Sequence, residues 1–284
     1  MNYLGALGAE GPEDLAGAHQ ALISARGWYE TLEPLPAPLP GSMLAIEDTH
    51  TARVPLSTQV RSAWARAYDA LGGFVDMSTV ADGMYVARPF AHHALIRMAC
   101  EATALGLWLL RPERKFRRVY RSLCLEYTHA GDVLGLSRTL TGAATHNTDE
   151  HDEIVVRLNE LMNTVSQLRE TKLQAIPRWS DILRDISPTV PAGAGHGADS
   201  PLVIWKTSSA FLHGSETTVR LLSEIEMLTP YEGDLKLASA QLRPSWRLLA
   251  SYYQMCVELL LDLSIRYLTL GTTDYSGKDL SEQK

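Results

Sequence analysis

The 284-residue sequence lacks the features by which several classes of protein are recognised. It has three cysteines, Cys100, Cys124 and Cys256, which lie far apart and form no Cys-x-x-Cys pair. This arrangement argues against a disulfide framework and against zinc bound by cysteine. We expect all three to be buried, reduced thiols within helices.

Long apolar runs are also missing. The most apolar stretches, around residues 102–110 and 257–263, are shorter than the roughly 18–20 residues that a helix needs to cross a bilayer. The N-terminal segment MNYLGALGAEGPEDL has no basic part and no long apolar part, so it does not resemble a signal peptide. We therefore expect a cytoplasmic protein that does not associate with a membrane.

No complete catalytic motif is present. The sequence contains no glycine-rich phosphate loop, no Gly-x-Ser-x-Gly nucleophile elbow and no internal repeat. Its formal net charge of −7 argues against a surface that coats nucleic acid, but it does not exclude a local basic site. The length is compatible with one large domain or two small ones.

What the sequence has in abundance is helical periodicity. The fold class that it predicts is mainly α, a multi-helix bundle around the apolar helices at 91–110 and 244–270. Alternating residues at 217–241, with a turn at 229–234, favour a small β-hairpin over a helix. The predicted helices cover about 11–33, 57–71, 77–110 (divided by Pro89), 112–140, 147–168, 202–213 and 244–270.

These elements predict a division of the chain into four parts. Residues 1–33 form an N-terminal helix, 34–56 a proline-rich linker, 57–270 the helical bundle domain and 271–284 a flexible tail. A Gly/Pro/Ala-rich insertion at 177–199 is expected to be a loop. The long Met- and Leu-rich helix faces are compatible with a homodimer.

Arg97 and Glu101 stand out because they are four residues apart on one face of an apolar helix. A buried charge without a partner costs several kcal/mol, so each of the two needs one. Either they form a simple pair that ties two helices together, or they line a pocket. In the second case we expect Ser209 and His213, also four apart, to face them across a cleft.

A basic run follows this helix. Arg114, Arg117, Arg118 and Arg121 are spaced i, i+3, i+4 and i+7, so they form one stripe on a helix. If that helix begins at Pro112, these cations crowd its N-terminal end, where the macrodipole favours anions. A bound phosphate or RNA backbone would relieve this conflict, and so would acidic side chains from elsewhere in the chain.

Histidines give two further candidates. Arg88 and His93 have an Arg-x4-His spacing, in which the histidine could act as a general base and the arginine could hold a phosphate. A capping or core histidine is the alternative. Glu126 and His129 form a Glu-x-x-His pair of the kind that di-iron bundles use twice, but this chain has it once. We therefore predict no metal ligand and no cofactor.

The Arg97-x3-Glu101 pair precedes the helix end Trp-Leu-Leu at 108–110, and the later segment carries Trp205, Ser209, His213 and Gly214. These motifs resemble uncharacterised helical proteins common in actinobacteria, and their layout is similar to the HEPN (higher eukaryotes and prokaryotes nucleotide-binding) bundle class. That class includes RNA-cleaving toxins and phage-defence proteins with an Arg-x4–6-His motif near the start of a late helix. Here Ser208, not arginine, stands five residues before His213, and Pro89 lies inside the Arg88/His93 spacing.

The residues and the resemblance together predict a cytoplasmic protein that binds a protein partner or RNA, in toxin or phage-defence biology. Two alternatives stay open: a metal-independent HEPN-like ribonuclease, and a helical metalloprotein that uses Glu101, Glu126 and His129. The candidate catalytic residues are His213, Arg97, Glu101, Arg88 and His93. The candidate anion-binding or RNA-binding residues are Arg114, Arg117, Arg118 and Arg121.

Overall fold

The computed structural model describes residues 10–79, 85–141, 149–187, 197, 200–227 and 240–275. Helices dominate these residues, so the predicted mainly-α, multi-helix class is confirmed. The chain forms two compact units. The first unit comprises residues 1–33, 65–104 and 183–261, and the second comprises 34–64, 105–182 and 262–284. This division differs from the predicted one because, in each unit, segments distant in sequence pack together.

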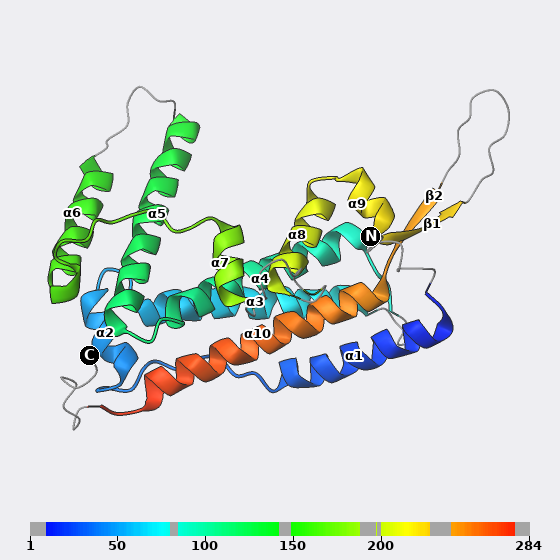
Figure 1. Cartoon of the computed structure of the whole chain (residues 1–284), viewed down its shortest axis with the longest axis horizontal. Coiled ribbons are helices and arrows are strands. Elements are labelled where there is room, and N and C mark those ends of the chain that lie inside the picture. Colours follow the sequence, from blue (N-terminus) through cyan, green and yellow to red (C-terminus); the bar gives the residue numbers. More distant parts are fainter. Residues whose placement is uncertain are drawn as a thin grey trace. The chain divides into compact units, whose positions relative to one another are not determined.

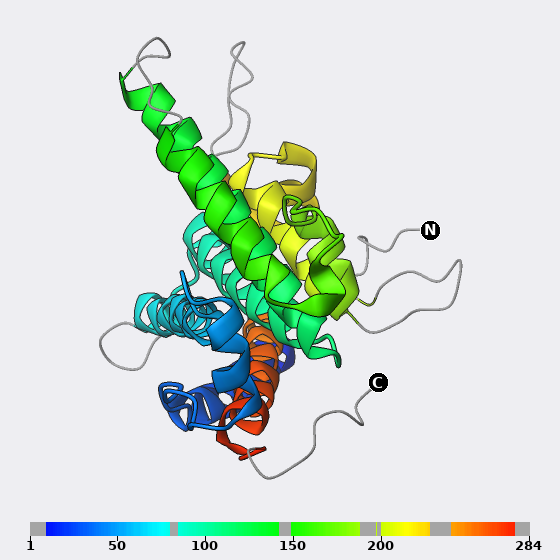
Figure 2. The ribbon, with the colours of Figure 1, turned by 90° about the vertical axis from the view of Figure 1, so that its left-hand side faces the viewer.

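The first unit contains α1 (Pro12–Glu30), α8 (Pro201–Leu212) and α9 (Glu216–Leu221), together with most of α3 (Leu56–Ser78), α4 (Pro89–Leu110) and α10 (Trp246–Thr272) (Figure 1). In its core the rings of Phe74 and Tyr253 stack with centroids 4.9 Å apart. Helix α8 lies beside the N-terminal part of α4 in both views (Figures 1 and 2). This pairing positions the candidate site described below.

The predicted hairpin is present in part. Strands β1 (Ser223–Met227) and β2 (Ala240–Pro244) pair antiparallel, with Ile225 opposite Leu242. Residues 217–221, however, belong to helix α9 and not to a strand. There Val219 and Leu222, three residues apart, pack together on Phe211, a spacing that suits a helix. The predicted turn at 229–234 lies outside the described residues.

The second unit is built on α5 (Lys115–Thr141) and α6 (Asp149–Asn163), which lie side by side (Figure 1). Their shared core includes Leu123, Leu158 and Leu161, and it extends to the 3-10 helix Ser166–Leu168. Helix α2 (Met43–His50) and parts of α3, α4 and α10 complete this unit.

Two short helices were missed. Helix α2 lies within the predicted proline-rich linker, because the alternating prolines end at Pro40 and the Ser42 hydroxyl then accepts the Ala45 amide hydrogen at an N-terminal cap. Helix α7 (Trp179–Ile186) lies within the predicted 177–199 loop, where Ile182 and Leu183 are buried. The rest of that loop from residue 188, except 197, and the predicted tail from residue 276 lie outside the described residues.

The cysteine prediction is confirmed, and the prediction about apolar runs needs correction. Cys100, Cys124 and Cys256 are free and buried. By length and composition, α4 and α10 are each long and apolar enough to cross a membrane, because an 18-residue window tolerates the few charges that interrupt them. In α4, 72% of that window is buried, as in the core helix of a globular protein. A cytoplasmic location stays a prediction.

Candidate functional site

In the first unit, Arg97 and Glu101 of α4 meet Trp205 and His213 from the α8 segment. Arg97 Nε donates to Glu101 Oε1 at 3.0 Å, and Trp205 Nε1 donates to the same oxygen at 2.6 Å. Arg97 Nη1 lies 3.3 Å from His213 Nε2, and the guanidinium carbon is 5.5 Å from the centroid of the Trp205 ring. We call these four residues the Arg97 cluster.

Local structure places His213 at the end of α8. The helix begins at Pro201 after the Ser200 side chain caps it, and it ends with His213 as its C-terminal cap. The next residue, Gly214, has a φ of +68°, in the left-handed region that glycine adopts without strain. Gly214 therefore ends α8 in a left-handed cap, directly after the exposed His213.

The Arg97 cluster is accessible to solvent. The side chains of Arg97 and Glu101 are each 23% exposed, so solvent reaches both. The Arg97–His213 hydrogen bond requires a lone pair on Nε2, which means that His213 is neutral in this arrangement. Among the described residues, Arg97 Nη2 and Glu101 Oε2 have no partner. The cluster can therefore offer a ligand the two N–H donors of Arg97 Nη2 and one carboxylate oxygen of Glu101.

The structure does not bring Arg88 and His93 together as a catalytic pair. The Arg88 backbone N–H donates to His92 Nδ1 at 2.8 Å, so the contact is with the neighbouring histidine. His93 is 2% exposed, its ring stacks on Phe211 with centroids 3.8 Å apart, and burial lowers its pKa to about 3. These contacts favour the alternative interpretation of His93 as a core residue over the predicted catalytic role.

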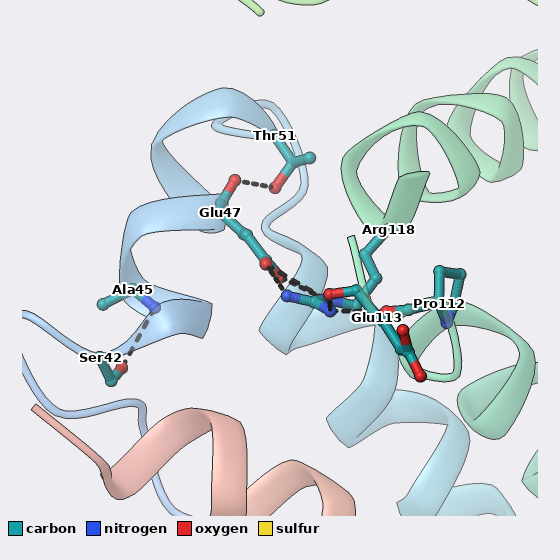
Figure 3. A network of polar contacts seen from close by, with 7 residues as sticks. All are labelled: Ser42, Ala45, Glu47, Thr51, Pro112, Glu113 and Arg118. Carbon is teal, nitrogen blue, oxygen red and sulfur yellow. Dashed lines mark hydrogen bonds and ion pairs between the residues drawn. The ribbon is translucent and has the colours of Figure 1, made fainter. Parts of the chain in front are cut away.

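In the second unit, Arg118 forms a buried ion pair with Glu47 (Figure 3). Its Nε lies 3.1 Å from both carboxylate oxygens of Glu47, and its Nη2 also donates to Glu47 Oε1. Its Nη1 donates to the backbone oxygens of Pro112 and Glu113 at 2.6 and 2.9 Å. The Arg118 and Glu47 side chains are only 4% and 0% exposed, and burial raises the pKa of Glu47 although Arg118 opposes this. Arg118 therefore cannot serve a surface RNA site.

Arg121 also has an internal role. Its Nη1 donates to the Trp108 carbonyl, and its guanidinium lies 4.7 Å from the centroid of the Trp108 ring. Trp108 is in the last turn of α4, where carbonyls lack partners within the helix and cations are favoured. The carboxyl end of α4 therefore partly offsets the unfavourable interaction that was predicted between the arginines and the macrodipole at the start of α5. Helix α5 begins at Lys115 and not at Pro112.

The remaining cations of the run stay exposed. We call Arg111, Arg114, Lys115 and Arg117 the basic segment. Each is exposed, and none has an ion-pair partner within the described ranges. Four arginines on other exposed helix faces pair with an acid about one turn away, in Arg26–Glu30, Arg157–Glu160, Arg220–Glu216 and Arg266–Asp262, whereas the exposed Arg61 and Arg138 have no such partner among the described residues. Of the predicted stripe, only Arg114 and Arg117 are available to a ligand.

The candidate metal ligands are engaged in other contacts. Glu126 Oε2 accepts from Arg53 Nη1 at 2.6 Å, and Glu126 Oε1 accepts from Gln59 Nε2 at 3.3 Å. His129 Nδ1 lies 3.9 Å from Glu126 Oε1. In the part of the chain that the structure describes, no group of three or more His, Cys, Asp or Glu residues could hold a metal ion.

The chain matches no family model, no curated protein and no solved structure. The resemblance to the HEPN class therefore stays a prediction from short motifs.

Sequence reasoning missed two polar residues that the structure makes prominent. Glu47 lies in the stretch that was predicted to be a linker. Acidic partners for the basic run were expected from elsewhere in the chain, but the sequence did not indicate that Glu47 would be one of them. Arg53 gave no signal, because nothing near it in sequence indicates that it reaches Glu126, 73 residues away.

Proposed function

We propose that this protein binds RNA through the basic segment. The observation that carries the proposal is the grouping of four exposed cations, Arg111, Arg114, Lys115 and Arg117, along one short segment, where none has an ion-pair partner among the described residues. In a protein of net charge −7, this is a local concentration of positive charge.

The chemistry of the segment suits a phosphate backbone better than a general acidic surface. Three of its four cations are arginines, whose planar guanidinium binds phosphate oxygens in a bidentate manner. Lys115 and Arg117 lie in the first turn of α5, where the helix macrodipole adds to the attraction for an anion. Arg118 and Arg121, which hold the connection from α4 to α5, fix the position of the segment.

Replacing Arg114 and Arg117 together by alanine is expected to weaken binding of a single-stranded RNA oligonucleotide. Two lost phosphate contacts should make the slope of log K against log salt concentration shallower by about 1.4, or 0.7 per contact on a single strand. Fluorescence anisotropy titrations at several salt concentrations measure this slope.

The matched control is the double variant Arg157→Ala/Arg220→Ala, which removes the same charge from exposed, paired positions. It should leave the salt slope nearly unchanged. Equal weakening in both double variants would mean that total charge, not the basic segment, governs binding. Failure of the unmodified protein to bind RNA at 50 mM salt would refute the proposal.

A second candidate function, a metal-independent ribonuclease, is favoured by one observation in the first unit. His213 Nε2 and Arg97 Nη1 are 3.3 Å apart, so a proton acceptor lies beside a cation that can stabilise a phosphate. Cleavage of RNA in the presence of EDTA, abolished by His213→Ala, is the expected result. If the unmodified protein binds RNA without cleaving it, the binding function stands alone. A role in toxin or defence biology stays a prediction from the resemblance.

A further inference from the structure

The second unit contains a cavity of about 200 Å³ that neither candidate function uses. It is lined by Arg53, by residues of α5 that include His129, Val133 and Leu134, and by His151 and Ile154 of α6. A cavity of about 150 Å³ with aliphatic walls can hold benzene. The cavity as a whole is therefore large enough for a single ring or a short branched chain, and it is open to solvent at Val133, which is 66% exposed.

The polar side of the cavity is rich in hydrogen-bond donors. Glu126 is covered, with a side chain 7% exposed, and each of its oxygens already accepts a hydrogen bond. Arg53 is 35% exposed and uses one nitrogen for Glu126, so its Nε and Nη2 have no partner within the described residues. His151 Nδ1 lies 3.2 Å from Asp152 Oδ1, and His151 Nε2 has no partner within the described residues.

We propose that this cavity binds a small organic carboxylate with an apolar body. The carboxylate accepts from the free edge of Arg53 and, when both ring nitrogens of His151 carry protons, from Nε2 of that imidazole, while the apolar body packs on Val133, Leu134 and Ile154. Glu150 also lines the cavity and is exposed, so its negative charge opposes the ligand. The proposal does not depend on RNA binding, because the basic segment contributes nothing to the cavity.

The test is a calorimetric titration of the full chain with benzoate. We expect saturable binding that Glu150→Gln tightens about fivefold, because removing a like charge near the ligand gives about 1 kcal/mol in a well-solvated site. His151→Gln should weaken binding about fivefold, and Arg53→Gln more than tenfold. Inorganic phosphate, which lacks the apolar body, and benzylamine, which carries the opposite charge, should each bind at least tenfold more weakly than benzoate.

Arg53→Gln leaves Glu126 without its cation and can unfold the unit, so the decisive variants are Glu150→Gln and His151→Gln. Arg157→Gln, which changes an exposed residue of α6 that does not line the cavity, serves as the control and should not alter the affinity. The proposal is overturned if benzoate shows no saturable binding at 10 mM. It is also overturned if Glu150→Gln weakens binding, or if benzylamine or phosphate binds as tightly as benzoate.

Discussion

Arg118→Ala is expected to lower the unfolding free energy by about 3–5 kcal/mol. The change leaves the carboxylate of Glu47, which is 0% exposed, without its ion-pair partner, and it removes the donor from the Pro112 and Glu113 carbonyls. A charge stranded in the interior costs much more than the net stability that an intact pair supplies. Urea denaturation followed by circular dichroism measures the loss.

The matched control is Arg117→Ala, the neighbouring residue on α5, which is exposed and should change stability by no more than about 0.5 kcal/mol. A double replacement, Glu47→Leu with Arg118→Met, should recover most of the stability lost in Arg118→Ala, because it removes both buried charges at once. If Arg118→Ala costs no more than Arg117→Ala, the ion pair is not buried in solution. A double variant less stable than Arg118→Ala would contradict the same account.

Acidification is expected to destabilise the first unit through His93, starting near pH 6.5. Burial lowers the pKa of His93 to about 3, whereas a histidine in an unfolded chain titrates near 6.5. Over this interval the unfolded state binds a proton that the folded state does not, so stability present above pH 6.5 is lost as the pH falls towards 3. By pH 4 the loss from this one residue is about 3 kcal/mol.

The variant His93→Gln tests this assignment. It removes the titrating ring, so between pH 6 and 4 its unfolding free energy should fall less steeply than that of the unmodified protein by about 1.4 kcal/mol per pH unit. Urea unfolding curves at several pH values give both slopes. His129→Gln, at a side chain 52% exposed, is the control and should keep the original slope. Equal slopes for the unmodified protein and His93→Gln would show that His93 does not stay neutral in the folded state.

Local patterns were sufficient for most of the long helices, but α3 continues to Ser78 where its end was predicted near residue 71, and residues 79 and 85–88 of the predicted 77–110 helix are not helical. The continuous apolar residues of α4 and α10, and the proline at the start of α4 and of α8, all act within a few residues along the chain. Short elements were harder to predict, because α2 and α7 span only eight residues each and owe their stability to packing against distant segments. Helix α9 was mistaken for a strand for the same reason.

For the candidate sites, the sequence by itself determined which charges needed partners. Arg97 and Glu101 lie in an apolar helical pattern, where desolvation makes an unpaired charge costly, and Arg118 belongs to a basic run at a helix start, where the macrodipole favours anions. Only the tertiary structure decided which partners they have. It gave Glu101 the indole of Trp205, 104 residues away, and it gave Arg118 the carboxylate of Glu47, 71 residues away. The need for a partner follows from the local sequence, whereas the identity of that partner depends on which distant segments pack together.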